Sequence, residues 1–367
     1  MKKEILPQGD LIRQLLVKSN ITSSNINQLL REKGVFLGHN EKNNSVPLLM
    51  KSIISPKDYE GLYNTQKNKE ETIKYKTSSI RCNTDFELSD LFDNHIDLNK
   101  SINERHTYKP NYKVIGNPNF YFEDSNTIIL EYNIERQNLL NDWTSNLTYH
   151  KGAVTLKKLS DGDLQISIQQ NSTSKETLEV NNIIVGKLKE VLKDKSIIRS
   201  NEDIISIKFK DFDNTSRIHF FYAFVSNFSI YLEFKSITDV DLYLDGNVES
   251  HEDVKRFLDE IDNLKLNGKE LQNHILLTKI EYFQKLIFGS IKFRYKLNYQ
   301  GIDGITIISL NFPEYVKNKE ESSELQVSID FILNKKYRNS QTENEIRKKL
   351  LEAVEIKKIE AYNNFKL

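Results

Sequence analysis

Residues 154–168 have the sequence VTLKKLSDGDLQISI, in which two runs of alternating apolar and polar residues flank Asp161-Gly162. An Asp-Gly pair between such runs is typical of a β-hairpin closed by a tight turn. Hydroxyl residues follow at 172–174, and apolar residues then recur at helical spacing as far as Leu192. This pattern predicts a long amphipathic helix capped at 172–174. A hairpin followed by a helix places this part of the chain in the α+β class.

The order of hairpin and helix returns later in the chain. Strands are predicted at 292–297, 305–311 and 325–333, with a turn at Asp303-Gly304. Helices are predicted at 250–264, 268–289 and about 341–362. Residue identity between the two copies is negligible, so the sequence favours one α+β body over an internal duplication.

Composition limits the classes of protein that the chain can belong to. The 367 residues include 52 Lys and Arg against 52 Asp and Glu, which excludes a surface that is basic all over but leaves room for a local basic patch. The single cysteine, Cys82, excludes an intramolecular disulfide and cysteine-based zinc or iron–sulfur sites. No apolar stretch is long enough for a membrane span, so we expect a cytoplasmic protein that has no membrane contact.

Residues 1–63 are predicted to form a compact helical domain. A hydroxyl residue at 22–24 can cap its second helix, and Gly34 suits the left-handed position that follows the end of that helix. Residues 35–38 (VFLG) form a short extended piece, and the next helix is predicted to start near Ser45 and Pro47, because proline is tolerated in a first turn.

The rest of the chain divides into a linker and a larger body. Residues 64–110 are polar with only short apolar groups, which is typical of a linker that carries one or two short helices. Residues 111–367 form the α+β body of β-hairpins and long helices, with 111–200 and 201–367 as candidate subdomains. We expect this body to dock a partner.

One pattern in the chain suggests catalysis. Glu233 and Lys235 lie two apart on a predicted strand, and Asp213 precedes them by twenty residues. Nucleases of the PD-(D/E)xK class use such a set, in which carboxylates hold Mg²⁺ and the lysine activates water. The period of two puts Glu233 and Lys235 on one face, but a solvated strand face has the same pattern, and no proline precedes the aspartate. The solvated face is the favoured interpretation.

Other catalytic motifs are missing from the sequence. The chain has no GxGxxG, GxxxxGK[ST], HExxH or GxSxG spacing, which argues against an ordinary NTPase, a dinucleotide enzyme, a histidine metal site or a serine hydrolase.

A second constellation is basic. Through Thr65 the chain has nine Lys and Arg against six Asp and Glu. Arg31, Lys33, Lys42 and Lys51 lie on helix ends and a loop of the predicted helical domain, where they could clamp DNA phosphates. A small lysine excess of this kind also serves ordinary solubility, and the residues alone leave both interpretations open.

The sequences LPQG at 6–9, LLREKGVFLG at 29–38 and VPLL at 46–49 carry a resemblance to a known family. The first 60 residues resemble the N-terminal domain of the non-nuclease subunit of a two-gene anti-phage system carried by prophages and phage satellites. That domain is in turn similar to SAP/HeH helix–extended–helix modules, which bind DNA. The remaining five-sixths of the chain resembles nothing that we identify.

The resemblance implies a non-catalytic, DNA-sensing subunit of a hetero-oligomer. Its partner would be a PD-(D/E)xK nuclease encoded by the neighbouring gene, and its ligand would be double-stranded DNA, with DNA ends as one candidate form. This chain would then need no cofactor, and Mg²⁺ would belong to the partner. Two alternatives stay open: a Mg²⁺-dependent nuclease that uses Asp213, Glu233 and Lys235, and a scaffold whose N-terminal module binds protein without DNA contact.

Overall fold

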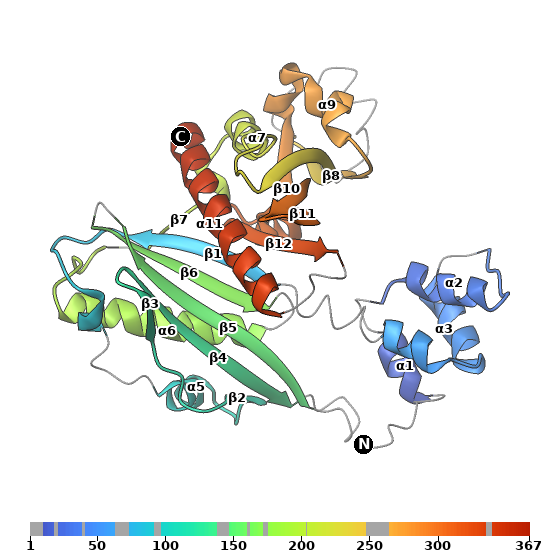
Figure 1. The fold of residues 1–367 in the computed structure, drawn as a ribbon, viewed down its shortest axis with the longest axis horizontal. Coiled ribbons are helices and arrows are strands. Elements are labelled where there is room, and N and C mark those ends of the chain that lie inside the picture. Colours follow the sequence, from blue (N-terminus) through green and yellow to red (C-terminus); the bar gives the residue numbers. More distant parts are fainter. Residues whose placement is uncertain are drawn as a thin grey trace.

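The computed structural model describes residues 10–17, 21–38, 41–62, 73–91, 97–137, 147–159, 162–171, 175–202, 204–246, 264–334 and 340–367. The chain has a small helical N-terminal domain and an α+β body built on a large antiparallel sheet (Figure 1). The domain has a hydrophobic core of its own, separate from those of the body. The predicted α+β class and the small N-terminal domain are therefore confirmed. No helix in these described ranges is long and apolar enough to cross a membrane.

The N-terminal domain consists of α1 (Asp10–Leu16), α2 (Ser23–Glu32), α3 (Lys42–Lys51) and a short helix at 56–62. Its core is aliphatic and consists of Ile12, Leu16, Ile21, Ile26, Leu30, Val46, Leu49 and Leu62. The Thr22 hydroxyl accepts a hydrogen bond from the Asn25 amide at 3.2 Å, and the Asn25 side chain accepts one from the Thr22 amide at 2.8 Å. Gly34 follows α2 with a φ of +79°. The predicted cap and end of this helix are both confirmed.

The start of α3 corrects the prediction. The helix begins at Lys42, with Glu41 at its N-cap, so Pro47 lies inside the helix as its sixth residue. A proline there removes one helical N–H and its ring crowds the carbonyl one turn earlier, yet α3 continues through Lys51. The buried side chains of Val46 and Leu49 hold this helix against the rest of the domain, so tertiary packing outweighs the proline.

The strands of the body are β1 (Ile73–Ile80), β2 (Tyr112–Val114), β3 (Tyr121–Asp124), β4 (Thr127–Gln137), β5 (Leu147–Lys158), β6 (Leu164–Asn171), β7 (Ile205–Ser206), β8 (Leu232–Leu244), β9 (Leu264–Asn267), β10 (Leu286–Tyr299), β11 (Ile302–Asn311) and β12 (Gln326–Leu333). Their order in the sheet is β2-β4-β5-β6-β1-β12-β11-β10-β8-β9, with β3 paired to β4 and β7 to β1. The hairpin of β5 and β6 is the one predicted from 154–168, with Gly162 at a φ of +89°. Asp161 and the predicted helix cap at 172–174 lie outside the described residues.

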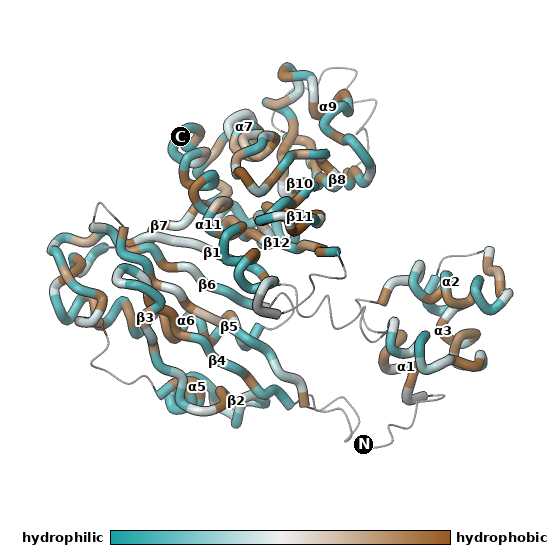
Figure 2. The backbone as a smooth tube through the Cα atoms, viewed as in Figure 1, coloured by the Kyte–Doolittle hydropathy of each residue, from teal (hydrophilic) through white to brown (hydrophobic). Residues whose placement is uncertain are grey.

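The helices of the body are η1 (Leu88–Leu91), α5 (Leu98–Arg105), α6 (Lys175–Asp194), η2 (Phe209–Asp211), α7 (Asn214–Tyr222), η3 (Leu271–Asn273), α9 (Ile275–Thr278), η4 (Ile280–Lys285), α10 (Pro313–Asn318) and α11 (Ser340–Phe365). The buried side of α6 packs on β4, β5 and β6 to form one core (Figure 2). A second core joins α7, α9 and α11 to β8, β10, β11 and β12. The single sheet therefore carries two cores.

β1 departs from the sequence expectation. The polarity of 64–110 indicates a linker, yet Ile73–Ile80 forms a strand in the middle of the sheet, between β6 and β12. Its sequence, IKYKTSSI, buries only Tyr75 and Ile80, so no hydrophobic alternation marks it. Backbone pairing with a strand on each side satisfies its N–H and C=O groups, and Tyr75 and Ile80 each belong to one of the two cores.

The helix predicted at 268–289 is also wrong. The segment forms η3, α9 and η4 and then enters β10, with Glu270 in the left-handed region at a φ of +61° and extended backbone at Lys279. Short helical turns can present apolar residues three and four apart just as one long helix does. Most of the helix predicted at 250–264 lies outside the described residues.

The predicted turn at Asp303-Gly304 lies elsewhere. Tyr299 pairs with Ile302, so the hairpin of β10 and β11 turns at Gln300-Gly301, where both φ angles are positive. Gly304 instead lies inside β11, where a Cβ would come within 2.7 Å of the Ile332 carbonyl oxygen. This glycine is needed for the close approach of β12 rather than for a turn.

Candidate nucleic-acid interface

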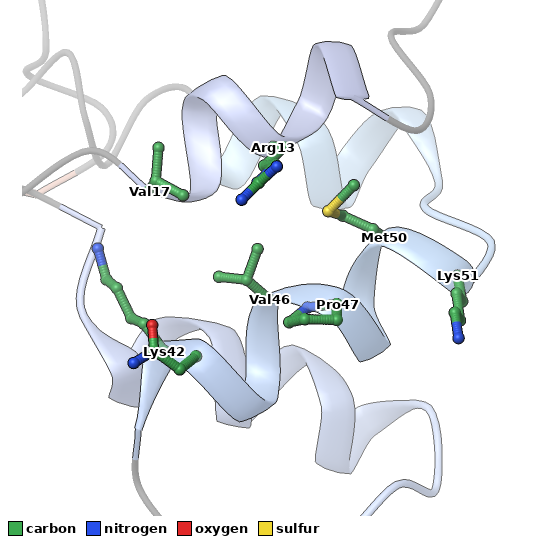
Figure 3. Close-up of a pocket in the computed structure, with 8 residues that line it drawn as sticks. Arg13, Val17, Lys42, Val46, Pro47, Met50 and Lys51 are labelled. Carbon is green, nitrogen blue, oxygen red and sulfur yellow. The ribbon is translucent and has the colours of Figure 1, made fainter.

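A groove of about 540 Å³ lies between α1 and α3 of the N-terminal domain (Figure 3). Its described lining residues are Arg13, Val17, Lys42, Asn43, Val46, Pro47, Met50 and Lys51. Three of these eight residues are cations and none is acidic. We call this site the α1–α3 groove.

The helices that form the α1–α3 groove are fixed by the core beneath it. Ile12 and Leu16 of α1 are fully buried, and Val46 and Leu49 bury the facing side of α3. Arg13 follows Ile12 by one position, so helical periodicity directs its side chain out of the core. Arg13 is accordingly exposed. Figure 3 shows Arg13 pointing into the groove, with Lys42 and Lys51 toward its opposite ends.

The floor of the α1–α3 groove is apolar. Val46 and Pro47 are neighbours on α3, and Met50 lies one turn further along the same helix. Val17, directly after α1, completes the floor and is 54% exposed. The groove therefore joins an apolar surface to positive charge, which suits a ligand that has an anionic part and an apolar part.

The structure brings together only part of the predicted basic set. Lys42 and Lys51 line the α1–α3 groove, while Arg31 and Lys33 are not among its lining residues. The Lys33 Nζ lies 2.8 Å from Asp58 Oδ2, and this hydrogen bond holds the pKa of the Asp58 carboxyl below its usual value. Lys33 therefore connects α2 to the helix at 56–62. Arg31 is exposed on α2, and its Nε donates to the Asn27 carbonyl at 3.3 Å.

Sequence reasoning missed Arg13. This residue lies some thirty positions from Lys42 and joins the site only because α1 packs on α3. A usable signal was present, since Arg13 lies between the core residues Ile12 and Leu16 of one helix and therefore faces outward beside the surface that α1 buries.

The residues of the nuclease alternative each have a local partner. Asp213 is the N-cap of α7, and its Oδ1 accepts hydrogen bonds from the Ser216 amide at 2.6 Å and the Ser216 hydroxyl at 2.8 Å. The hydrogen bond from the Ser216 backbone N–H lowers the pKa of the Asp213 carboxyl. Glu233 accepts a hydrogen bond from Lys235, which lowers the pKa of Glu233. Within the described ranges, no group of three or more His, Cys, Asp or Glu could hold a metal ion.

The position of Glu233 and Lys235 suggests a structural role for them. β9 pairs with β8 only from Asp239 to Leu242. The first half of β8 therefore has β10 as its one paired strand among the described residues. On the other side, the Asn227 side chain accepts from the Phe234 amide at 2.7 Å, and the Gln272 side chain accepts from the Ile237 amide at 3.0 Å. Charged side chains on such an edge oppose pairing with another chain.

The comparisons with known proteins bear on the N-terminal domain. Residues 10–72 match the family described as the GAPS4b protein N-terminal domain. This range contains the whole α1–α3 groove and supports the predicted resemblance to the N-terminal domain of an anti-phage defence subunit. The likeness to SAP/HeH modules is not confirmed by this match.

Beyond this domain, the comparisons add little. No curated protein matches the chain. The di-domain ARO/CYC StfQ from the steffimycin biosynthetic pathway is similar over 80% of this chain and 97% of its own, at 9% identity and a TM-score of 0.21. DynU16 from the dynemicin biosynthetic locus is similar over 71% and 86%, at 8% identity and a TM-score of 0.19. With TM-scores this low, neither likeness bears on the fold or function of this chain.

Proposed function

We propose that this chain is the DNA-sensing, non-catalytic subunit of an anti-phage defence complex, and that the α1–α3 groove binds the phosphates of double-stranded DNA. The observation that carries the proposal is the convergence of Arg13, Lys42 and Lys51 on one groove without an acidic lining residue among those described. The match of residues 10–72 to the GAPS4b N-terminal domain supports the defence role.

The charge of the α1–α3 groove suits a polyanion. A cation that neutralises a phosphate releases condensed counterions, and this supplies much of the affinity of non-specific DNA binding. Arg13 adds a planar guanidinium that can contact a phosphate with two N–H groups. Phosphate contacts carry no base information, so binding through these three cations does not depend on DNA sequence.

The catalytic step in this proposal belongs to a partner, a PD-(D/E)xK nuclease encoded by the neighbouring gene. Two observations favour that division of labour. Asp213 caps a helix and Glu233 pairs with Lys235, so these side chains have structural partners. Residues 10–72 match a domain of an anti-phage defence subunit. DNA ends stay a candidate form of the ligand.

Isolation of the complex from its native locus tests the proposal. We expect the affinity-tagged chain, purified at low salt, to retain a second subunit and DNA that DNase removes. The Arg13→Gln/Lys51→Gln chain should retain the subunit and lose the DNA. Loss of the second subunit with retention of DNA would contradict the proposal and would make the N-terminal domain a protein-docking module.

A further inference from the structure

The floor of the α1–α3 groove is apolar although phosphate binding needs no apolar surface. Val17, which is 54% exposed, lies on the side of Arg13 toward Lys42, and Met50 lies on its other side, toward Lys51 (Figure 3). From this arrangement we infer that the α1–α3 groove holds the base of an unpaired nucleotide, while the cations hold the adjoining phosphates. This inference rests on the proposed DNA binding and deepens it by naming the class of DNA preferred.

Two features of the groove fit one extruded base. Bases taken out of the helical stack are held between aromatic or apolar side chains, and Met and Pro side chains serve as apolar contacts to unstacked bases. The volume of about 540 Å³ lies within the range of sites that enclose a small ligand. In an intact duplex the paired bases lie inside the sugar–phosphate backbone and cannot reach this floor.

The lining of the groove also predicts how selective it is among bases. Asn43 is the one uncharged polar side chain among the described lining residues. An amide can donate and accept, so it can contact the edge of any base. Apolar contact accepts every base because each has an apolar face. We therefore expect a preference for unpaired over paired DNA with little preference among sequences.

An acidic peptide with an apolar face is the competing occupant. The distribution of charge favours the nucleotide, because cations lie both in the centre and at the two ends of one compact groove (Figure 3). Within a strand each sugar is flanked by two phosphates, so one bound nucleotide offers more than one anionic group to these cations. Binding of a peptide instead is one outcome of the test below.

The test uses two covalently closed circular DNA molecules, neither of which has an end. One circle is fully paired, and the other has the same sequence on one strand with a five-nucleotide bubble. We expect the full-length chain to bind the bubble about fivefold more tightly than a paired site, compared per site because each circle offers many paired sites. This ratio corresponds to the low end of the contribution of one stacked base. Equal affinity per site would overturn the inference and leave duplex binding intact.

Variants then locate the preference. Val17→Asn and Met50→Gln make the floor polar without a change of charge, and each should abolish the fivefold preference for unpaired DNA. Ile53→Asn is the matched control, because Ile53 is 92% exposed outside the groove; it should keep the preference. A preference that survives both floor variants would overturn the inference. Binding to neither circle would overturn the proposed function itself. If an acidic amphipathic peptide displaces bubble DNA and free single strands do not, the groove is a peptide site.

Discussion

Lys33 and Lys51 have similar positions in the sequence pattern, and the structure gives them different roles. Both lie at the end of a helix, but Lys33 pairs with Asp58 while Lys51 lines the α1–α3 groove. The sequence marked both as candidate phosphate contacts. Which lysine is engaged by a carboxylate depends on where the helix at 56–62 packs, and no local pattern encodes that contact.

Asp58 stabilises the N-terminal domain through two contacts. Its Oδ2 accepts from the Ser55 amide at 3.2 Å as well as from Lys33, and these bonds lower the pKa of the carboxyl. A lowered pKa means that the stabilisation is present above the unfolded-state pKa and is lost as the pH falls through the folded-state pKa. We expect Asp58→Asn to lower the free energy of unfolding of this domain by about 1 kcal/mol at pH 7.

Hydrogen exchange of residues 21–62 at increasing urea measures this effect. The difference between the natural chain and Asp58→Asn should shrink toward zero as the pH falls from 5 to 3. A difference that stays constant over this range would show that the ionised carboxylate is not the stabilising group.

At the scale of elements, the sequence predicted those whose local pattern is strong. The alternation around Asp161-Gly162 predicted β5 and β6, and the helical spacing that follows predicted α6. β1 was missed because Lys74, Lys76 and the hydroxyl residues after them give no alternation. Its place in the sheet is set by hydrogen bonds to β6 and β12, strands that are distant in sequence.

α11 shows a related limit. This helix, which the sequence predicts at about 341–362, has an apolar stripe of Ile346, Leu350, Ala353 and Val354, and three of these residues are fully buried in the second core of the body. This stripe therefore packs within the chain. The sequence alone could not distinguish burial inside the chain from burial against a partner, because both need the same periodicity.

Two glycines offer a matched test of the element packing. Gly304→Ala should lower the melting temperature, since its Cβ would lie 2.7 Å from the Ile332 carbonyl oxygen and backbone would have to move; overpacking of this kind costs about 1–3 kcal/mol. A Cβ added at Gly186 of α6 would meet no atom within 4 Å. Gly186→Ala should therefore raise the free energy of unfolding by about 0.5–1 kcal/mol through helix propensity. Calorimetry of both variants measures these changes in stability. A Gly304→Ala chain as stable as the natural one would refute the close approach of β11 and β12.

At the scale of the whole molecule, the same order of elements occurs twice in the body. In the first half, β1 is followed by short helices, then by the β4-β5-β6 meander and then by the long helix α6. In the second half, β7 is followed by the short helices η2 and α7, then by strands β8, β10, β11 and β12, and then by the long helix α11. In the first half β1 pairs with the last strand, β6. In the second half β7 itself pairs with β1, but the residue after it, Ile207, accepts at its carbonyl from the amide of Leu325, which precedes β12, at 2.8 Å. The sequence indicated a single body because the two halves share almost no residue identity. Their similarity lies in the order of their helices and strands.

We propose that the α1–α3 groove, and not basic charge in general, contacts DNA. Each lost phosphate contact should reduce the slope of log K against log salt on duplex DNA by about 0.9. The decisive measurement is this slope for the full-length natural chain, for Arg13→Gln/Lys51→Gln, and for Arg31→Gln/Lys57→Gln, which removes two exposed charges of the same domain outside the groove. We predict a slope of about −2.7 for the natural chain, a loss of about two units for the groove variant and an unchanged slope for the control. Equal slopes for the two double variants would contradict the claim.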